Sequence, residues 1–168
     1  MKVLHKQANS HDCIICGIDN EGGLHASFYE MEDDSLIGLF TYKAHHQSYP
    51  ERVHGGMICA LCDEMIGRAI WIKHPLTYGC TMKLEMEYHA PVPYEKPLKA
   101  RSYVEKETSL TWKGICEIRD EEGKLLARCH ALYMFLTKKQ ISPNENVTDD
   151  DLNIMVPDDV KEIDWKVK

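Results

Sequence analysis

A nearly continuous apolar run behind two glycines constrains the fold of this chain more than any other feature. The run covers residues 55–73, starts directly after His54 and stops at His74–Pro75. Its apolar side chains would cover most of the circumference of a helix, and a helix that is apolar nearly all round is buried rather than laid on a surface. Proline after the run is a typical helix stop. The rest of the chain must therefore cover one long central helix.

Patterns with a period of two, which are typical of strands, flank this helix on both sides. Two predicted strands precede it, at residues 24–31 and 36–42, with a turn at Asp33–Ser35 between them. Four predicted strands follow it, at residues 82–88, 98–107, 110–119 and 125–136. A sheet with one solvent-exposed face must cover the helix with its other, apolar face. The sequence predicts an α+β fold, with an antiparallel sheet of about six strands around one helix.

Both ends of the chain lack such patterns. Residues 1–12 are expected to be a loose start, and residues 138–168 a polar, acidic extension that includes Asp149–Asp151. A few apolar residues of this extension, such as Ile163, could dock on the domain. We interpret residues 1–137 as a single domain and the remainder as an extension that is partly ordered at best.

Charge and composition exclude several classes of function. The chain has 168 residues and a formal net charge of -7, which argues against nucleic-acid binding because that function needs a clustered basic surface. The first ten residues have no apolar core of a signal peptide, and no segment is long and apolar enough to span a membrane. Seven cysteines without a secretory context indicate reduced thiols and a cytoplasmic location.

The start of the helix and two acids inside it form the best candidate site. Gly55 and Gly56 would leave backbone N–H groups open at a helix N-terminus, where a developing oxyanion is stabilised. Asp63 and Glu64 lie about two turns further on, about 100° apart around the helix, so periodicity alone does not choose between them. An acid in an apolar helix must be paired or used in chemistry. His54 is either a catalytic base or, more commonly for such a residue, a loop histidine that shapes the turn.

Two Cys-x-x-Cys pairs suggest a second possibility. Cys13 and Cys16 together with Cys59 and Cys62 have the composition of a four-cysteine zinc site, which would suit a metal-stabilised interaction protein. The second pair, however, lies inside the predicted helix, where cysteines commonly serve as small core residues. The first pair could still bind a metal together with His11, but we expect no metal site and no cofactor.

The motif around the helix resembles a known family. The chain is similar to PaaI-like acyl-CoA thioesterases, whose hotdog fold curls an antiparallel sheet around one helix. The similarity extends over residues 13–137. The matching residues are Val53-His54-Gly55-Gly56, Asp63 nine positions after the histidine, Gly67, residues 81–88 followed by Pro91-Val92, residues 120–127, and Cys13-x-x-Cys16-Gly17 with Asn20 and Gly23-Leu24.

The resemblance implies hydrolysis of an acyl-CoA thioester to a free acid and CoA, in homodimers or dimers of dimers with active sites at subunit interfaces. Asp63 would be the general base or nucleophile and the Gly55 N–H the oxyanion donor, while Thr81 would come from the partner subunit to orient the acid or the water. Some members have an asparagine six residues before the histidine. Here Ser48 stands there beside Gln47, so either could bind the substrate.

Two other functions remain open. A hotdog dehydratase or hydratase would need a histidine and an acid facing each other, and the position of Asp63 in the helix argues against it. A non-catalytic acyl-CoA-binding or regulatory module would use the same pocket without turnover.

Overall fold

The computed structural model describes residues 1–141 and 153–168, so the acidic run Asp149–Asp151 lies outside the described residues. The strands are β1 (Val3–Lys6), β2 (Ser27–Met31), β3 (Leu36–Phe40), β4 (Tyr78–Tyr88), β5 (Leu98–Glu107), β6 (Thr111–Arg119) and β7 (Leu125–Leu136). The helices are η1 (Ala44–His46), α1 (Gly55–Ala69), η2 (Ile70–Ile72) and α2 (Lys138–Ile141).

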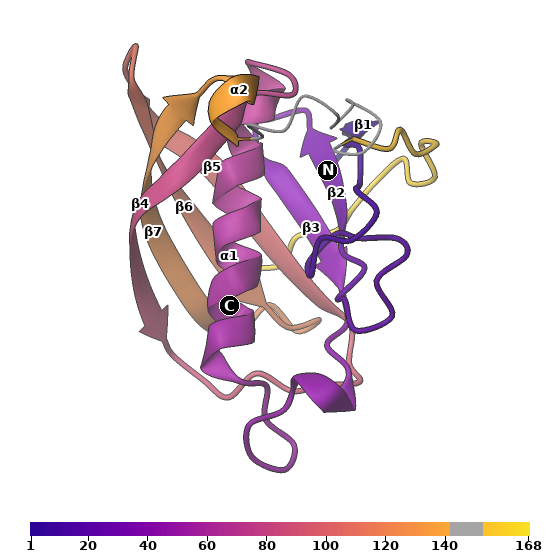
Figure 1. The fold of residues 1–168 in the computed structure, drawn as a ribbon. Coiled ribbons are helices and arrows are strands. Elements are labelled where there is room, and N and C mark those ends of the chain that lie inside the picture. Colours follow the sequence, from indigo (N-terminus) through magenta and orange to yellow (C-terminus); the bar gives the residue numbers. More distant parts are fainter. Residues whose placement is uncertain (142–152) are drawn as a thin grey trace.

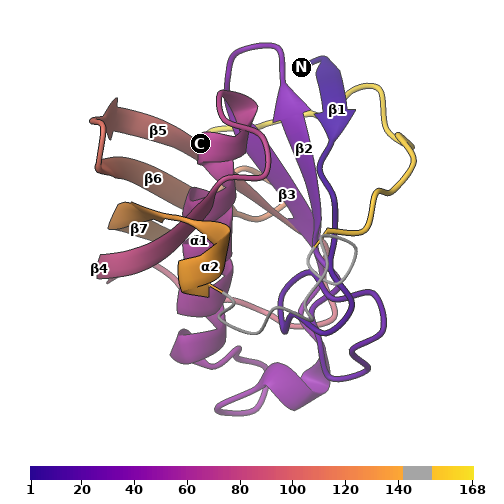
Figure 2. The same cartoon turned by 45° about the horizontal axis from the view of Figure 1, so that its top comes forward.

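The seven strands form one antiparallel sheet in the order β1-β2-β3-β5-β6-β7-β4. The sheet curves around α1, which runs across its concave face (Figure 1, Figure 2). This confirms the hotdog arrangement of a sheet around a central helix. Within the described residues, no helix is long and apolar enough to cross a membrane.

The prediction of a loose start for residues 1–12 is wrong, because residues 3–6 form strand β1. This is the strand that the prediction of about six strands lacked. β1 pairs with β2 and forms one edge of the sheet. The strand has only four residues and its Leu4 is exposed, so it carries no alternation that a sequence pattern could reveal.

The C-terminal segment, residues 153–168, runs back along β1 (Figure 2). The Val3 N–H donates to the Lys161 carbonyl and the Ile163 N–H donates to the Met1 carbonyl, each over 2.9 Å. Ile163 is buried in a second apolar cluster with side chains of β2 and β3. This part of the acidic extension is therefore an integral layer on the sheet.

Helix α1 begins and ends through local interactions. The His54 ring caps it by accepting a hydrogen bond from the Gly56 N–H over 2.9 Å. The α-helix ends at Ala69 and tightens into η2, so the helix predicted to reach Lys73 finishes as a 3₁₀ turn. Gly114 of β6 lets the helix approach the sheet closely, since an added Cβ there would lie 2.7 Å from Ile66 Cγ2.

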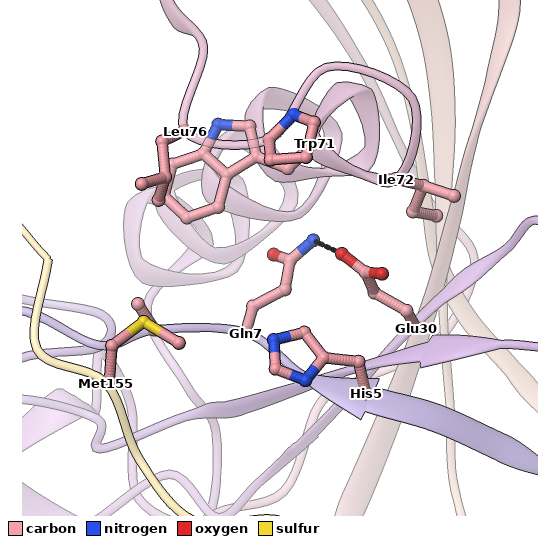
Figure 3. Close-up of a pocket in the computed structure, with 9 residues that line it drawn as sticks. His5, Gln7, Glu30, Trp71, Ile72, Leu76 and Met155 are labelled. Carbon is pink, nitrogen blue, oxygen red and sulfur yellow. Dashed lines mark hydrogen bonds between the residues drawn. The ribbon is translucent and has the colours of Figure 1, made fainter.

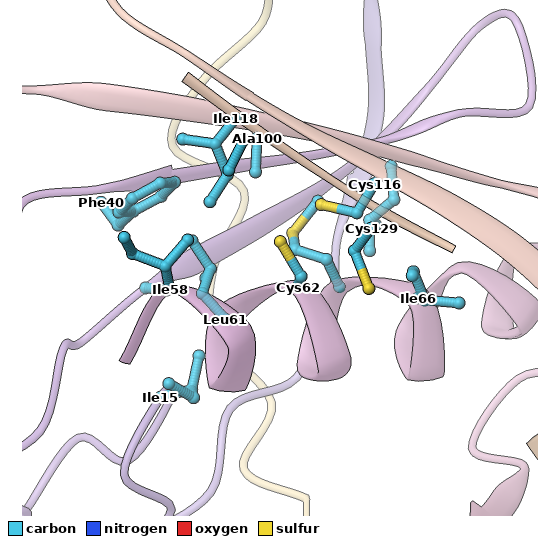
Figure 4. Packing of buried hydrophobic residues seen from close by; sticks show 14 of the residues in the cluster. Ile15, Phe40, Ile58, Leu61, Cys62, Ile66, Ala100, Cys116, Ile118 and Cys129 are labelled. Atoms are coloured by element: carbon cyan, nitrogen blue, oxygen red, sulfur yellow. The ribbon is translucent and has the colours of Figure 1, made fainter. Parts of the chain in front are cut away.

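The main core lies between α1 and the sheet (Figure 4). Cys62 of the helix faces Cys116 of β6 and Cys129 of β7, and all three are fully buried. Residues 7–26, between β1 and β2, form an N-terminal lead-in. Its Ile15 packs on the opposite side of the helix. The helix is thus covered by the sheet on one side and by the lead-in on another, as its apolar circumference requires.

Candidate functional site

Asp63 projects from α1 toward two hydroxyl groups on neighbouring strands. Its Oδ1 accepts a hydrogen bond of 2.7 Å from Thr81 Oγ1 on β4 and another from the Tyr133 hydroxyl on β7. The Tyr133 oxygen also lies 2.6 Å from the Asp63 carbonyl oxygen. No hydrogen bond to Oδ2 is present among the described residues. One carboxylate oxygen is therefore held while the other is open to a ligand or a water.

A β-bulge aims Thr81 at Asp63. Thr81 pairs with Tyr133 and Lys83 pairs with Leu132, so Met82 is an extra residue in the ladder. Strict alternation predicted Met82 on the inner face and Thr81 on the outer one. The bulge reverses both, leaving Met82 exposed and placing Thr81 on the same face as Leu84. The Thr81 that meets Asp63 belongs to the same chain, whereas the resemblance implied that it would come from the partner.

Tyr133 is a site residue that lies within the predicted strand 125–136 but was not among the predicted site residues. Its ring stacks on Trp112 at 4.9 Å between centroids and 11° between planes. Burial and the Asp63 carboxylate raise the pKa of Tyr133 far above its ordinary value. The hydroxyl therefore stays protonated and acts as a fixed donor to Asp63. The pairing of Tyr133 with Thr81 would have identified it as a site residue, but this pairing depends on the bulge at Met82, which the sequence does not reveal.

These groups line a surface hollow of about 210 Å³. Its wall includes Asp63, Thr81 and Tyr133 together with Trp71 and Tyr78. An acid supported by two hydroxyl donors beside aromatic walls is suited to activate a water next to an apolar group.

Glu64, the second acid, has a different environment. Its Oε1 is 2.5 Å from Nε of Arg68, one helical turn later. Arg68 is buried and also donates to the Ala8 carbonyl and to Cys16 Sγ. Burial alone would lower the pKa of Arg68, but the Glu64 charge and hydrogen bond raise it. Glu64 thus serves as the counter-ion of a buried guanidinium, although its carboxylate still borders the Asp63 hollow.

The helix start forms a separate part of the candidate site. His54 uses its ring to cap α1, which agrees with the turn-shaping interpretation, and this cap occupies the Gly56 N–H. The Met57 and Ile58 N–H groups donate to the His54 carbonyl. The Gly55 N–H is left without a partner among the described residues. It is the one N–H of this helix start that is available to an oxyanion.

The hollow beside Gly55 has a volume of about 390 Å³ and includes Ser48 and Tyr88 in its wall. The Tyr88 hydroxyl donates to the Gly55 carbonyl over 3.0 Å. Gln47 is exposed and does not line this hollow. Of the two residues predicted to bind substrate, only Ser48 lines the hollow at the helix start.

One chain does not bring the two halves of the predicted site together. Asp63 follows Gly55 by eight residues on a straight helix, which separates them by about 12 Å. A catalytic acid and an oxyanion donor must both lie about 3 Å from the reacting group. The two hollows also share no lining residue.

Comparison with known proteins identifies the family of this arrangement. Residues 51–127, which contain the glycines, α1, strands β4, β5 and β6 and the start of β7, match the profile of the thioesterase superfamily. The matched segment, 77 of the 168 residues, has the sequence pattern of a thioesterase-superfamily domain. No curated protein matches the sequence.

Solved structures of this superfamily have the same fold. A thioesterase superfamily protein aligns with a TM-score of 0.67 and 25% identity over 74% of this chain, which spans 60% of that protein. PaaI from the phenylacetic acid degradation operon of E. coli aligns with a TM-score of 0.61 and 17% identity, over 68% of this chain and 81% of PaaI. Zebrafish thioesterase superfamily member 2 gives 0.57 and 16%, over 61% and 75%.

The two cysteine pairs of this thioesterase-superfamily domain lie apart. Cys62 packs against Cys116 and Cys129 in the core, as expected for a small core residue. In the described part of the chain, the only cluster with metal-ligand geometry is Cys13, Cys16 and Glu64. The four-cysteine zinc site considered from the sequence is therefore not assembled.

A further hollow of the domain, about 240 Å³, lies near the end of α1 (Figure 3). Trp71, Leu76 and Met155 line it, and Gln7 donates to Glu30 over 2.9 Å on its floor. It shares only Trp71 with the Asp63 hollow and contains none of the predicted catalytic residues.

Proposed function

We propose that this protein is an acyl-CoA thioesterase in which Asp63 activates water. The observation that carries the proposal is the Asp63 carboxylate, held at Oδ1 by Thr81 and Tyr133 with Oδ2 open toward a hollow. Superfamily membership of residues 51–127 supports a thioester as the substrate class. Seven cysteines, all of them free in the structure, suit the reducing cytoplasm.

In this mechanism Asp63 acts as the general base. Oδ2 accepts a proton from a water, which attacks the thioester carbonyl carbon, while Thr81 and Tyr133 keep the carboxylate in one orientation. A positioned base of this kind contributes about 10²–10⁴ to the rate. The Gly55 N–H and the positive end of α1 stabilise the oxyanion, a contribution of about 3 kcal/mol for one donor. The C–S bond then breaks, and the proton held by Asp63 passes to the CoA sulfur, so CoA leaves as the thiol and Asp63 is again a carboxylate.

The separation of Gly55 and Asp63 makes a homodimer part of the proposal. Each active site combines Asp63 of one copy with the Gly55 N–H of a second copy, because one helix holds them about 12 Å apart. Strand β4 offers a surface for this contact. It lies at the open end of the sheet, has 11 residues, and exposes Met82 and Tyr88. Dimers of dimers would extend the same assembly.

The test is hydrolysis of a panel of acyl-CoA thioesters, with short, long and aryl acyl groups, followed by the thioester absorbance. Thiol reagents are unsuitable because the protein contributes seven cysteines of its own. Asp63→Asn keeps the size of the side chain and removes the base, so we expect kcat to fall by about 10³-fold. Glu64→Gln is the matched control, since it keeps an acceptor for Arg68 and should retain most of the activity.

An active Asp63→Asn variant would refute the proposed base. If the wild-type protein binds acyl-CoA tightly but leaves the thioester intact, the protein is an acyl-CoA-binding module instead. Sedimentation of the wild type should show at least a dimer, and a monomer with full activity would exclude the shared site.

A further inference from the structure

The Cys13-x-x-Cys16 turn lies outside the proposed catalytic machinery and has a built structure of its own. The Gly17 N–H donates to the Cys13 carbonyl over 2.8 Å and closes the turn. A Cβ at Gly17 would lie 2.5 Å from that carbonyl oxygen, so the turn requires glycine at this position. The two sulfur atoms lie within 4.8 Å of each other.

The two thiols differ in access. Cys13 is half-buried, whereas Cys16 is 1% exposed. Both border a hollow of about 400 Å³, which shares Glu64, Arg68 and Trp71 with the hollow beside Asp63. A small molecule can therefore reach Cys13 first, with Cys16 behind it.

The polar groups around Cys13 favour its thiolate. Its sulfur accepts hydrogen bonds from the Ile15 N–H at 3.3 Å and the Cys16 N–H at 3.4 Å. The Cys16 thiol, as a donor to the Cys13 sulfur, lowers the pKa of Cys13 and these backbone donors add to the effect, against the opposing influences of burial and Glu64. A thiolate, rather than a thiol, is the nucleophile in exchange with disulfides.

The position of Arg68 favours thiol chemistry over a metal site at this turn. Its guanidinium bridges Glu64, at 2.5 Å from Oε1, and Cys16, at 3.0 Å from Sγ. It is buried and stacks against Phe28 and Trp71, so it is fixed in this place. The Arg68 charge already neutralises the negative charge that a zinc ion would need in this cluster. A second buried cation beside Arg68 would be repelled.

We propose that Cys13 and Cys16 are a thiol–disulfide exchange site for small-molecule disulfides. The Cys13 thiolate attacks one sulfur of a disulfide RSSR, the S–S bond breaks, and RS⁻ leaves. Cys16 then attacks the Cys13 sulfur of the mixed disulfide and releases the second RS⁻. The two cysteines are oxidised to one disulfide, RSSR is reduced, and the two cysteine protons end on the two RSH products. The proposal does not depend on thioester hydrolysis.

The test exposes the reduced, full-length protein to glutathione disulfide, alkylates the remaining thiols at timed intervals, and maps each cysteine by peptide mass. We expect Cys13 to react at least about 10-fold faster than the other half-buried cysteines, Cys59 and Cys80. The wild type should then lose the mass of two hydrogen atoms through a Cys13–Cys16 disulfide. The Cys16→Ser variant should stop at the glutathione adduct on Cys13.

Cys80→Ser is the matched control and should behave as the wild type, whereas Cys13→Ser should form neither product. Equal reaction rates at Cys13, Cys59 and Cys80 in the wild type would overturn the proposal without reliance on any variant. Uptake of one zinc ion per reduced chain, with Cys13 and Cys16 both protected from alkylation, would overturn it in favour of a metal site.

Discussion

Asp63 and Glu64 are adjacent on one helix but bind chemically different partners, and their roles differ accordingly. Asp63 receives two neutral hydroxyl donors on a single oxygen. Glu64 is bound to a buried guanidinium that also anchors the N-terminal lead-in at Ala8 and Cys16. The hydroxyl donors to Asp63 leave its Oδ2 open toward the hollow, whereas the carboxylate of Glu64 is bound to Arg68. Asp63 is therefore the acid suited to accept a proton.

Tyr133→Phe should show what the hydroxyl contributes. The ring would keep its stack on Trp112, while Asp63 would lose one of its two donors. We expect kcat for acyl-CoA hydrolysis to fall by about 10- to 100-fold with little change in KM. The free energy of unfolding should fall by about 1 kcal/mol, the typical value of one hydrogen bond. The measurements are steady-state kinetics and urea unfolding.

Tyr103→Phe is the control for this prediction, because Tyr103 is an exposed tyrosine of the same sheet. An unchanged kcat in Tyr133→Phe would show that Thr81 alone orients the acid.

Part of the candidate site could be predicted from the sequence because it depends on spacing along one helix. The glycines, the cap at His54 and the acids within α1 all follow from the chain between residues 54 and 64. Tyr133 and the orientation of Thr81 depend on the register of β4 against β7, and one bulge at Met82 alters that register. A single inserted residue leaves no local pattern, so this half of the site required the structure.

At the scale of elements, α1 and the sheet approach each other closely at Gly114. Gly114→Ala would place a methyl group 2.7 Å from Ile66 Cγ2 and 2.9 Å from the Tyr103 carbonyl oxygen. We expect a loss of about 1–3 kcal/mol in the free energy of unfolding, the usual cost of overpacking a core. Urea denaturation measures it. Gly22→Ala is the control, as its added Cβ would meet only the Asn20 side chain at 3.5 Å, and equal losses in both variants would contradict the prediction.

A carboxylate between two guanidinium groups ties β6 to β7. Glu117 accepts hydrogen bonds from Arg128 at 2.7 Å and from Arg119 at 2.8 Å. Burial alone would raise the pKa of Glu117, but these two partners lower it below the ordinary 4.5. A lowered pKa in the folded state adds stability above the unfolded pKa, and this stability is lost as the pH falls through the folded value.

Glu117→Gln should therefore be less stable than the wild type at neutral pH, and the difference should shrink as the pH drops below 4.5. Urea unfolding at a series of pH values measures it. The exposed Glu121→Gln variant should follow the wild type throughout. A difference between Glu117→Gln and the wild type that is constant with pH would show that charge is not its cause.

The strands differ in how well the sequence predicted them. The bounds of β5 and β7 match the prediction, because long half-buried strands carry a clear alternation. Strand β1 has four residues and is held largely by partners distant in sequence. Its formation depends on tertiary contacts that no local propensity encodes.

At the scale of the whole molecule, the C-terminal segment completes a second apolar cluster on the sheet. Ile163 is 4% exposed and packs with Tyr29, Met31 and Ile37. Ile163→Ala should lower the free energy of unfolding by about 2 kcal/mol, through lost burial and a residual cavity. Val167→Ala is the control, since Val167 is 66% exposed. An equal, small effect of both variants on urea unfolding would mean that the segment contributes little to stability.

The same segment also makes the two edges of the sheet unequal. Any sheet that does not close into a barrel has two edges, each with free N–H and C=O groups able to take another strand. Here residues 161–163 occupy the β1 edge, while no strand lies beyond β4 among the described residues. Copies joined through both edges could add without limit into a filament. With a single edge available, the β4 contact proposed above can join only another β4 about a two-fold axis, and growth by strand pairing stops at two copies.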